Sequence, residues 1–161
     1  MGYYLSDEND LSRFVLSQFI GTKLEPEVLQ AVELLCDRLD DDGFLSEDPA
    51  ELAASLGVSD AVISRALTEL QAADPAGVGA RDRTECLSLQ IERHAGDHRL
   101  ARIIVEQFMD ELAENGYGAI SRKTGASEAL VREECDLIRS LNPRPGTGFS
   151  RRENLSYVTP D

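Results

Sequence analysis

Apolar residues recur every three or four positions along almost the whole chain, and this spacing leaves few folds open. Such a stripe lies on one face of an α-helix and is buried against other helices. No convincing alternation of apolar and polar residues is present outside the last residues. We therefore expect an all-α fold with an irregular C-terminal tail. The predicted helices cover residues 11–19, 26–39, 49–56, 60–72, 82–94, 100–114, a short stretch around Ile120, and 128–141.

Breaks between these helices divide the chain into four parts. We expect a disordered or vector-derived N-terminus over residues 1–9, a first helical subdomain over 10–95, a second over 96–146, and an extended linker over 147–161.

No apolar run approaches the roughly 18 residues that a membrane-spanning helix needs. The acidic start also lacks the basic and then apolar stretch of a signal peptide. The sequence therefore predicts a cytoplasmic protein without a membrane partner.

An internal repeat links the two predicted subdomains. Gly57-Val58-Ser59-Asp60-Ala61 recurs 68 residues later as Gly125-Ala126-Ser127-Glu128-Ala129, and the apolar positions on both sides agree at the same offset. Each copy reads as a short helix, a tight turn and a longer helix. Ser59 and Ser127 are suited to cap the longer helix, because a serine hydroxyl accepts a hydrogen bond from a free backbone N–H there. The repeat predicts a helix-turn-helix-like unit in each subdomain.

Charge is distributed unevenly between the two halves. Residues 1–80 hold 16 acids and 4 bases, a net charge of −12, whereas residues 81–161 hold 14 acids and 12 bases, a net charge of −2. A domain with a total of −14 is repelled by the phosphates of nucleic acid. An acidic surface of this kind suits a partner that presents basic protein surface.

Direct DNA contact by the helix-turn-helix units is the alternative reading. Helices that read DNA usually offer Arg, Lys, Asn or Gln to bases and phosphates. Acids match or outnumber bases on the predicted exposed faces of the two longer helices, which we assign to Asp60, Ser64, Arg65, Thr68, Glu69 and Gln71 and to Glu128, Arg132, Glu133, Asp136 and Arg139. The composition of these faces therefore favours protein docking over base readout.

The sequence shows no catalytic, cofactor-binding or metal-binding constellation. His94 and His98 are four residues apart, but Gly96 lies between them and no third ligand cluster is present. Three widely spaced cysteines are not a zinc or disulfide framework, and we expect buried free thiols. Gly77-Val78-Gly79 follows a helix and lacks the third glycine of a dinucleotide loop. We expect no enzyme activity and no cofactor.

The segment from Asp74 to Gln90 is too ordered in composition for a casual linker. Gly77 and Gly79 permit close backbone approach, and Asp82 and Glu85 favour the positive end of the next helix. Arg81 has a planar fork that suits either the free carbonyls of the preceding helix or a nearby carboxylate. A role in fixing the angle between the first unit and the next helix is as well supported as partner contact.

This segment resembles the D-P-x-G-V-x-A-R-D-x-x-E-C-L-x-x-Q stretch of the sigma-54 class of bacterial RNA polymerase sigma factors. Three further segments are similar to that family and occur in its order: Leu39-x-x-x-Gly43-Phe44-Leu45, Leu141-Asn142-Pro143-Arg144-Pro145-Gly146 and Tyr157-Val158-Thr159-Pro160-Asp161. Phe44 replaces the usual tyrosine, Arg83 stands where an aliphatic residue is common, and about the first ten residues show no likeness.

The resemblance implies a domain that docks on bacterial core RNA polymerase through two helical subdomains. In that family an N-terminal region meets an ATP-driven activator and a C-terminal region reads promoter DNA; neither is within these 161 residues. The residues that match the motifs are candidates for polymerase contact or for holding the fold: Asp74, Pro75, Gly77, Val78, Ala80, Arg81, Asp82, Glu85, Cys86, Leu87, Gln90, Pro143, Arg144, Pro145 and Gly146.

Overall fold

A computed structural model describes the backbone of residues 2–147 and the side chains of residues 10–147. This part of the chain contains helices and no strand, which confirms the predicted all-α class. The motif at residues 157–161 lies outside the described residues. The helices are α1 (Gly2–Ser17), α2 (Pro26–Cys36), α3 (Pro49–Leu56), α4 (Asp60–Gln71), α5 (Arg83–Glu92), α6 (Arg99–Gln107), α7 (Met109–Ala113), α8 (Tyr117–Thr124) and α9 (Glu128–Ser140).

The first core is built by α1 to α4 and the loop that follows them. α4 packs against both α2 and α3, and α1 packs against α2. Burial follows the helical period, as Leu11, Val15 and Phe19 show at the start of the chain. The interior of this core is formed by Leu11, Val15, Phe19, Val28, Ala31, Val32, Leu35, Cys36, Leu45, Leu52, Ala53, Ile63, Ala66, Leu70, Ala73 and Val78.

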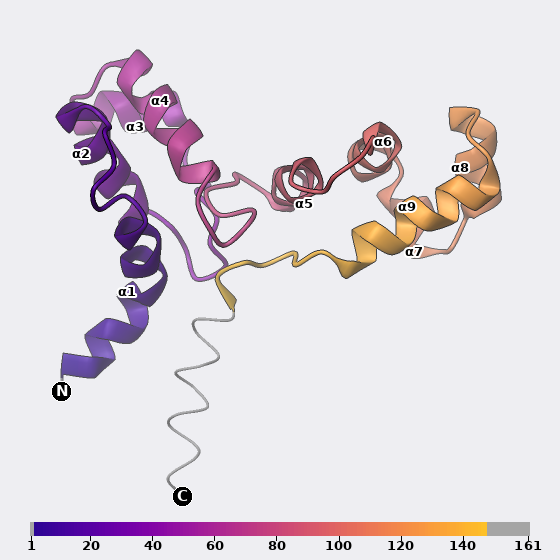
Figure 1. Ribbon diagram of the computed structural model, residues 1–161, viewed down its shortest axis with the longest axis horizontal. Helices are drawn as coiled ribbons and strands as arrows, with labels where there is room; N and C mark the ends of the chain where they lie inside the picture. Colours follow the sequence, from indigo (N-terminus) through magenta and orange to yellow (C-terminus); the bar gives the residue numbers. More distant parts are fainter. Residues whose placement is uncertain (1, 148–161) are drawn as a thin grey trace, which may run out of the picture.

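The second core is built by α5 to α9. α6 packs against both α5 and α9, and α8 packs against α9. Helices α1 to α4 lie on one side of the molecule and α6 to α9 on the other, with α5 in the middle (Figure 1). The interior of the second core is formed by Leu87, Ile91, Ala101, Ile104, Val105, Leu112, Ile120, Val131, Cys135 and Ile138.

The division between the cores differs from the predicted boundary at residues 95 and 96. Val78 is the last residue of the first core, and Leu87 of α5 is already in the second. The loop at residues 93–98 connects two helices of the same core. Its Gly and polar residues mark a turn, and a turn signal does not distinguish a loop within a core from one between cores.

The turn of the helix-turn-helix unit is the same in both copies. Gly57 ends α3 with φ +69° and Gly125 ends α8 with φ +79°, the left-handed conformation that glycine adopts without a Cβ penalty. Ser59 accepts a hydrogen bond from the Val62 N–H, and Ser127 accepts one from the Leu130 N–H, both at 3.2 Å. The repeated sequence thus predicted a repeated turn correctly.

Two helix ends in the first core differ from the predictions. α1 begins at Gly2 and so includes backbone that we expected to be disordered; no proline interrupts it, and extending a formed helix costs less than nucleating one. α2 ends at Cys36, before the expected stop after Leu39. We expected Gly43 to cap this helix in the left-handed conformation; it has φ +90°, but its N–H donates to the Asp40 carbonyl oxygen in a separate turn.

The single helix predicted over residues 100–114 is broken at Phe108. That residue has φ −129° and ψ 27°, outside the helical region, and it separates α6 from α7. The apolar residues here are spaced by four, at Leu100, Ile104, Phe108 and Leu112. A straight helix has 3.6 residues per turn, so a four-residue spacing rotates steadily away from one face. With the helix broken at Phe108, Leu112 is buried in the second core together with Ile104.

Candidate functional site

Three segments that carry the motif residues meet at the junction between the two cores. The Gly79 N–H donates to the Gly43 carbonyl oxygen at 2.9 Å, and the Leu45 N–H donates to the Ala80 carbonyl oxygen at 2.8 Å. The Gly146 N–H donates to the Asp42 carbonyl oxygen at 2.8 Å. The chain after α9 therefore returns to the turn at residues 40–43, as Figure 1 shows. We call residues 40–45, 74–82 and 142–147 the junction.

The turn in the first of these segments is organised by Asp40. Its carboxylate oxygen Oδ1 accepts hydrogen bonds from the backbone N–H groups of Asp42 at 3.0 Å and Phe44 at 2.9 Å. The Asp40 N–H in turn donates to the Phe44 carbonyl oxygen at 3.0 Å. An aspartate that satisfies the backbone of its own turn is a structural element of that turn. The aspartate-rich motif thus supplies the surface on which Gly146 rests.

Gln90 connects α5 to the segment after α9. Its side-chain Nε2 donates to the Asn142 carbonyl oxygen at 2.5 Å, and its Oε1 accepts from the Asn142 N–H at 2.9 Å. The side-chain amide of Gln90 therefore binds both the N–H and the carbonyl oxygen of one backbone residue, as a neighbouring β-strand would. Gln90 is buried, so both ends of its amide need partners. The Sγ of Cys86 lies beside the same carbonyl, at 3.7 Å.

Two glycines allow the segments of the junction to approach this closely. A Cβ on Gly77 would lie 2.6 Å from Cys86 Sγ and 3.1 Å from Gln90 Nε2, and the residue has φ +95°. A Cβ on Gly146 would overlap the Asp41 carbonyl oxygen and lie 2.7 Å from the Gly43 nitrogen. Any other residue at either position must push backbone or buried side chains apart.

The predicted site residues divide into a buried and an exposed set. Pro75 and Glu85 are half-buried. The buried residues fill the junction: Gly77, Val78, Ala80, Cys86, Leu87, Gln90, Pro145 and Gly146. The exposed residues surround it: Asp74, Arg81, Asp82, Pro143 and Arg144.

Asp82 and Glu85, whose charges we expected to favour the start of the next helix, accept backbone hydrogen bonds there. Asp82 accepts a hydrogen bond from the Glu85 N–H at 2.9 Å, and Glu85 accepts one from the Arg81 N–H at 2.8 Å. Of the two partners considered for the Arg81 guanidinium, the structure shows the carboxylate, with Nε 3.6 Å from Glu85 Oε1. The first bond satisfies a backbone donor that the helix start leaves free, and the second binds the N–H of the residue before the cap.

Arg93 and Gln18, which are not among the predicted site residues, bind the backbone at the end of α4. Arg93 donates to the carbonyl oxygens of Gln71 at 3.1 Å and Ala73 at 2.6 Å, and it pairs with Asp74 at 2.8 Å. Gln18, directly after α1, bonds both the N–H and the carbonyl oxygen of Asp74, at 2.8 and 2.6 Å. The carbonyl-binding role considered for Arg81 therefore belongs to Arg93. Only the unsatisfied carbonyls of a helix end could have suggested it.

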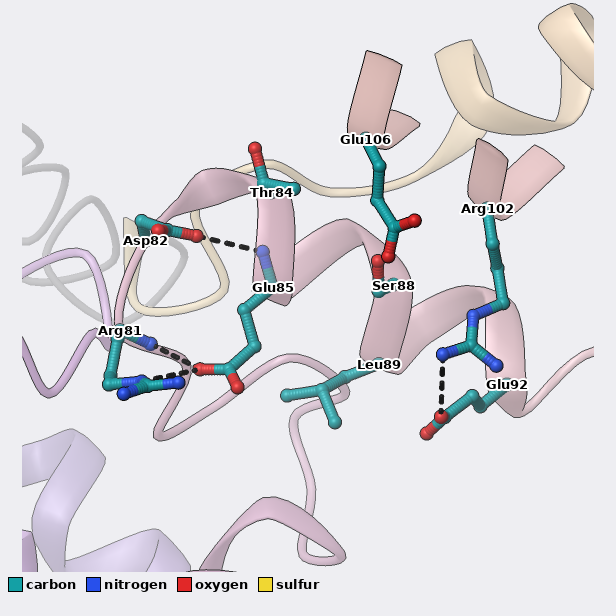
Figure 2. A pocket seen from close by; sticks show the side chains of 9 residues that line it. All are labelled: Arg81, Asp82, Thr84, Glu85, Ser88, Leu89, Glu92, Arg102 and Glu106. Atoms are coloured by element: carbon teal, nitrogen blue, oxygen red, sulfur yellow. Dashed lines mark hydrogen bonds and ion pairs between the residues drawn. The ribbon is translucent and has the colours of Figure 1, made fainter. Parts of the chain in front are cut away.

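A groove of about 340 Å³ runs between α5 and α6, beside the junction. Figure 2 shows Arg102 and Glu106 of α6 facing the side chains of α5. Arg102 lies 3.7 Å from Glu92, so one base of the groove is paired across it. Four acids and two bases line the groove, giving it an acidic balance: Arg81, Asp82, Thr84, Glu85, Ser88, Leu89, Glu92, Arg102 and Glu106.

The bases on the two longer helices of the helix-turn-helix units already have partners. Arg65 of α4 pairs with Glu69 at 3.1 Å, and Arg132 of α9 pairs with Glu128 at 3.2 Å. Arg139 donates to the Leu112 carbonyl oxygen at 2.7 Å and to side-chain oxygens of two further residues, so its guanidinium is part of the second core's framework. These cations are poorly placed to receive a phosphate.

The described residues contain no cluster of three or more His, Cys, Asp or Glu side chains that could hold a metal ion. All three cysteines are buried free thiols, as predicted. Burial raises the pKa of the Cys36 thiol to about 12, and Asp37 and Glu33 add to this rise. Burial also raises the pKa of Cys86 and Cys135. Thiols held in the protonated form are poor nucleophiles.

The chain is similar to a known protein family. The family model described as "Sigma-54 factor, core binding domain" matches residues 2–161, and so includes the first residues, in which we expected no likeness. Three relatives carry the name RNA polymerase sigma-54 factor: the Sinorhizobium fredii protein is 37% identical over 92% of this chain, the Bacillus subtilis protein 36% over 79%, and the Caulobacter vibrioides protein 34% over 98%.

The chain corresponds to only part of these relatives. It covers 29% of the Sinorhizobium fredii and Bacillus subtilis proteins and 31% of the Caulobacter vibrioides protein. None of the helices within residues 2–147 combines the length and apolar character that crossing a membrane requires.

Proposed function

Because this chain belongs to the sigma-54 factor core-binding-domain family, we propose that it docks a sigma-54-type initiation factor on bacterial core RNA polymerase. It carries no active site in this proposal, requires no cofactor, and acts in the cytoplasm. Contact with promoter DNA and with an ATP-driven activator belongs to other regions of the longer proteins that carry this domain.

The observation that carries this proposal is that the bases on the surface of α4 and α9 have partners, whereas acids are in excess over the first half of the chain. The exposed bases of α4 and α9 are paired with carboxylates or bound to backbone, while residues 1–80 keep an excess of 12 acids. Such a surface repels phosphate and attracts basic protein surface. We therefore place the main polymerase contact on the first core, with the exposed Glu33 and Asp37 at the end of α2 among its charges.

We assign the buried motif residues a structural role in this docking. Gly77, Gln90 and Gly146 fix how the two cores are joined, and a fixed relation lets both cores meet one partner without an ordering cost. The exposed Arg81 and Arg144 at the rim of the junction are candidates for direct contact. If Arg81 only supports the start of α5, Arg81→Ala lowers stability together with affinity; if it is a contact, affinity falls alone.

The test measures binding of the purified chain to bacterial core RNA polymerase by sedimentation velocity at near-physiological salt. We expect association of the unaltered chain at micromolar concentration. The double variant Glu33→Lys and Asp37→Lys should weaken it about tenfold or more, because two attractive charges become repulsive. Raising the salt concentration should also weaken binding, since exposed charges are screened.

A matched control changes the net charge by the same amount elsewhere. Glu133→Lys and Asp136→Lys place two lysines on the exposed face of α9 in the second core, and we expect a much smaller loss. Equal losses in both variants would exclude the first core as the main contact. Absence of association, or a shift of duplex DNA without polymerase, would contradict the docking function itself.

A further inference from the structure

His98 and Glu134 form a partly buried contact that joins the loop after α5 to the middle of α9. Both carboxylate oxygens of Glu134 lie 3.1 Å from His98 Nδ1. The other ring nitrogen, Nε2, lies 2.8 Å from the Ala95 carbonyl oxygen. Only 6% of the Glu134 side chain and 24% of the His98 side chain are exposed. The Glu134 carboxylate is therefore buried, while the His98 ring covers it at the edge of the second core and keeps its bond to Ala95 at the surface.

The atoms around the ring fix how many protons this pair must hold. A carbonyl oxygen and an ionised carboxylate only accept hydrogen bonds. A neutral imidazole has one N–H and can satisfy one of the two; the imidazolium has two N–H groups and satisfies both. Both contacts together therefore require one proton more than the neutral ring holds.

Loss of that proton is costly because Glu134 is buried. A carboxylate with so little exposure needs a donor or an opposite charge. The neutral His98 ring would then either present the lone pair of Nδ1 to the carboxylate or lose its hydrogen bond to the Ala95 carbonyl oxygen. The structure shows no other hydrogen-bond donor to the Glu134 carboxylate among the described residues.

The other charged and titratable groups near the ring come from its own loop and the start of α6. Asp97 pairs with Arg99 at 2.8 Å, so its charge is largely compensated there. The His94 ring stands edge-on to His98 with centroids 6.2 Å apart. From α9 the facing charge is Glu134.

We propose that the contact between His98 and Glu134 holds the α5–α6 loop against α9 while the His98 ring is protonated. The second core is then less stable when rising pH removes the proton. The pair makes the joint between α5 and the rest of this core sensitive to pH. Its role is independent of polymerase docking, because it depends on contacts inside the second core only.

The direction of the effect follows from the folded protein's preference for the protonated ring. The hydrogen bond to Ala95, and next the one to Glu134, raise the pKa of His98 above the usual range of a histidine. A group whose pKa is raised by folding stabilises the fold fully below its unfolded pKa. That stabilisation is lost as the pH rises through the pKa of the folded state.

The experiment compares thermal unfolding of the full chain between about pH 6 and about pH 9, with NMR detection of the histidine ring nitrogens. We expect the melting temperature to fall across this range in the unaltered chain. His98→Gln should be less stable at the lower pH and should lose most of this dependence. His94→Gln, which changes the neighbouring exposed histidine, should retain it.

A second variant keeps the test decisive if His98→Gln folds poorly. In Glu134→Gln the ring keeps its place but loses the buried charge, so its titration should move to lower pH. An unchanged His98 titration in Glu134→Gln, or equal pH dependence in His98→Gln and the unaltered chain, would overturn the proposal.

Discussion

At the scale of single residues, the glycines of this chain serve two different physical purposes. Gly57 has φ +69° and no atom within 4 Å of a Cβ built on it, so the turn requires only its backbone conformation. Gly77 has φ +95° and would also place its Cβ 2.6 Å from Cys86 Sγ. The need for glycine at residue 77 is visible in the sequence, but the sulfur atom that it approaches is not.

We expect alanine to separate these two costs. Gly57→Ala should lower the free energy of unfolding by about 1–2 kcal/mol, the cost of the left-handed conformation for a residue with a Cβ. Gly77→Ala should lose at least about 1 kcal/mol more, since it adds overlap in a packed site. Urea unfolding followed by circular dichroism measures both losses.

Gly146→Ala tests the overlap by itself, because no positive φ accompanies it. It should destabilise the attachment of the segment after α9 to the turn at residues 40–43.

Equal losses of stability for Gly57→Ala and Gly77→Ala would contradict the first of these predictions, because the added methyl group at residue 77 would then cost no free energy of unfolding.

At the scale of elements, the repeated turn was predictable because its determinants are local. A glycine that ends one helix and a serine that caps the next lie within three residues of each other, at 57–59 and at 125–127. The break at Phe108 was not predictable, because no glycine or proline marks it. There, packing of apolar side chains into a common core prevails over the local preference for a continuous helix.

The two caps provide a matched pair of variants. Ser59→Ala and Ser127→Ala should each lower the free energy of unfolding by about 1 kcal/mol, because each leaves a backbone N–H of the longer helix without its side-chain acceptor. Chemical denaturation of the single and double variants measures the losses and their additivity.

Ser64→Ala, on the exposed face of α4, is the control for the caps. No cap is removed there, and alanine is a slightly better helix former than serine. A loss at Ser64 as large as at Ser59 would mean that the capping bonds contribute nothing measurable.

At the scale of the whole molecule, two cores are held together by a small set of contacts. Gln90 binds both backbone groups of Asn142, and Gly146 rests on the turn at residues 40–43. The chain thus passes from the first core to the second and returns to the first (Figure 1). Hydrogen bonds to paired backbone groups therefore define how the two cores are joined.

We expect Gln90→Ala to loosen the relation between the cores while leaving each folded. The variant should lose about 1 kcal/mol of stability from unmade hydrogen bonds, and small-angle X-ray scattering should show a broader distribution of dimensions. Gln18→Ala is the matched control, because Gln18 makes the same double contact with Asp74 within the first core. If both variants scatter identically to the unaltered chain, Gln90 does not fix the relation between the cores.

The all-α class, the repeated turn, the capping residues and the acidic first half followed from the sequence alone. Each depends on neighbouring residues or on sums over the chain, so the order of residues contains the necessary information. The tertiary structure decided that α5 belongs to the second core, that Arg93 holds the end of α4, and that Glu134 faces His98. These depend on distances between residues far apart in the chain, and such distances are set only when the cores pack.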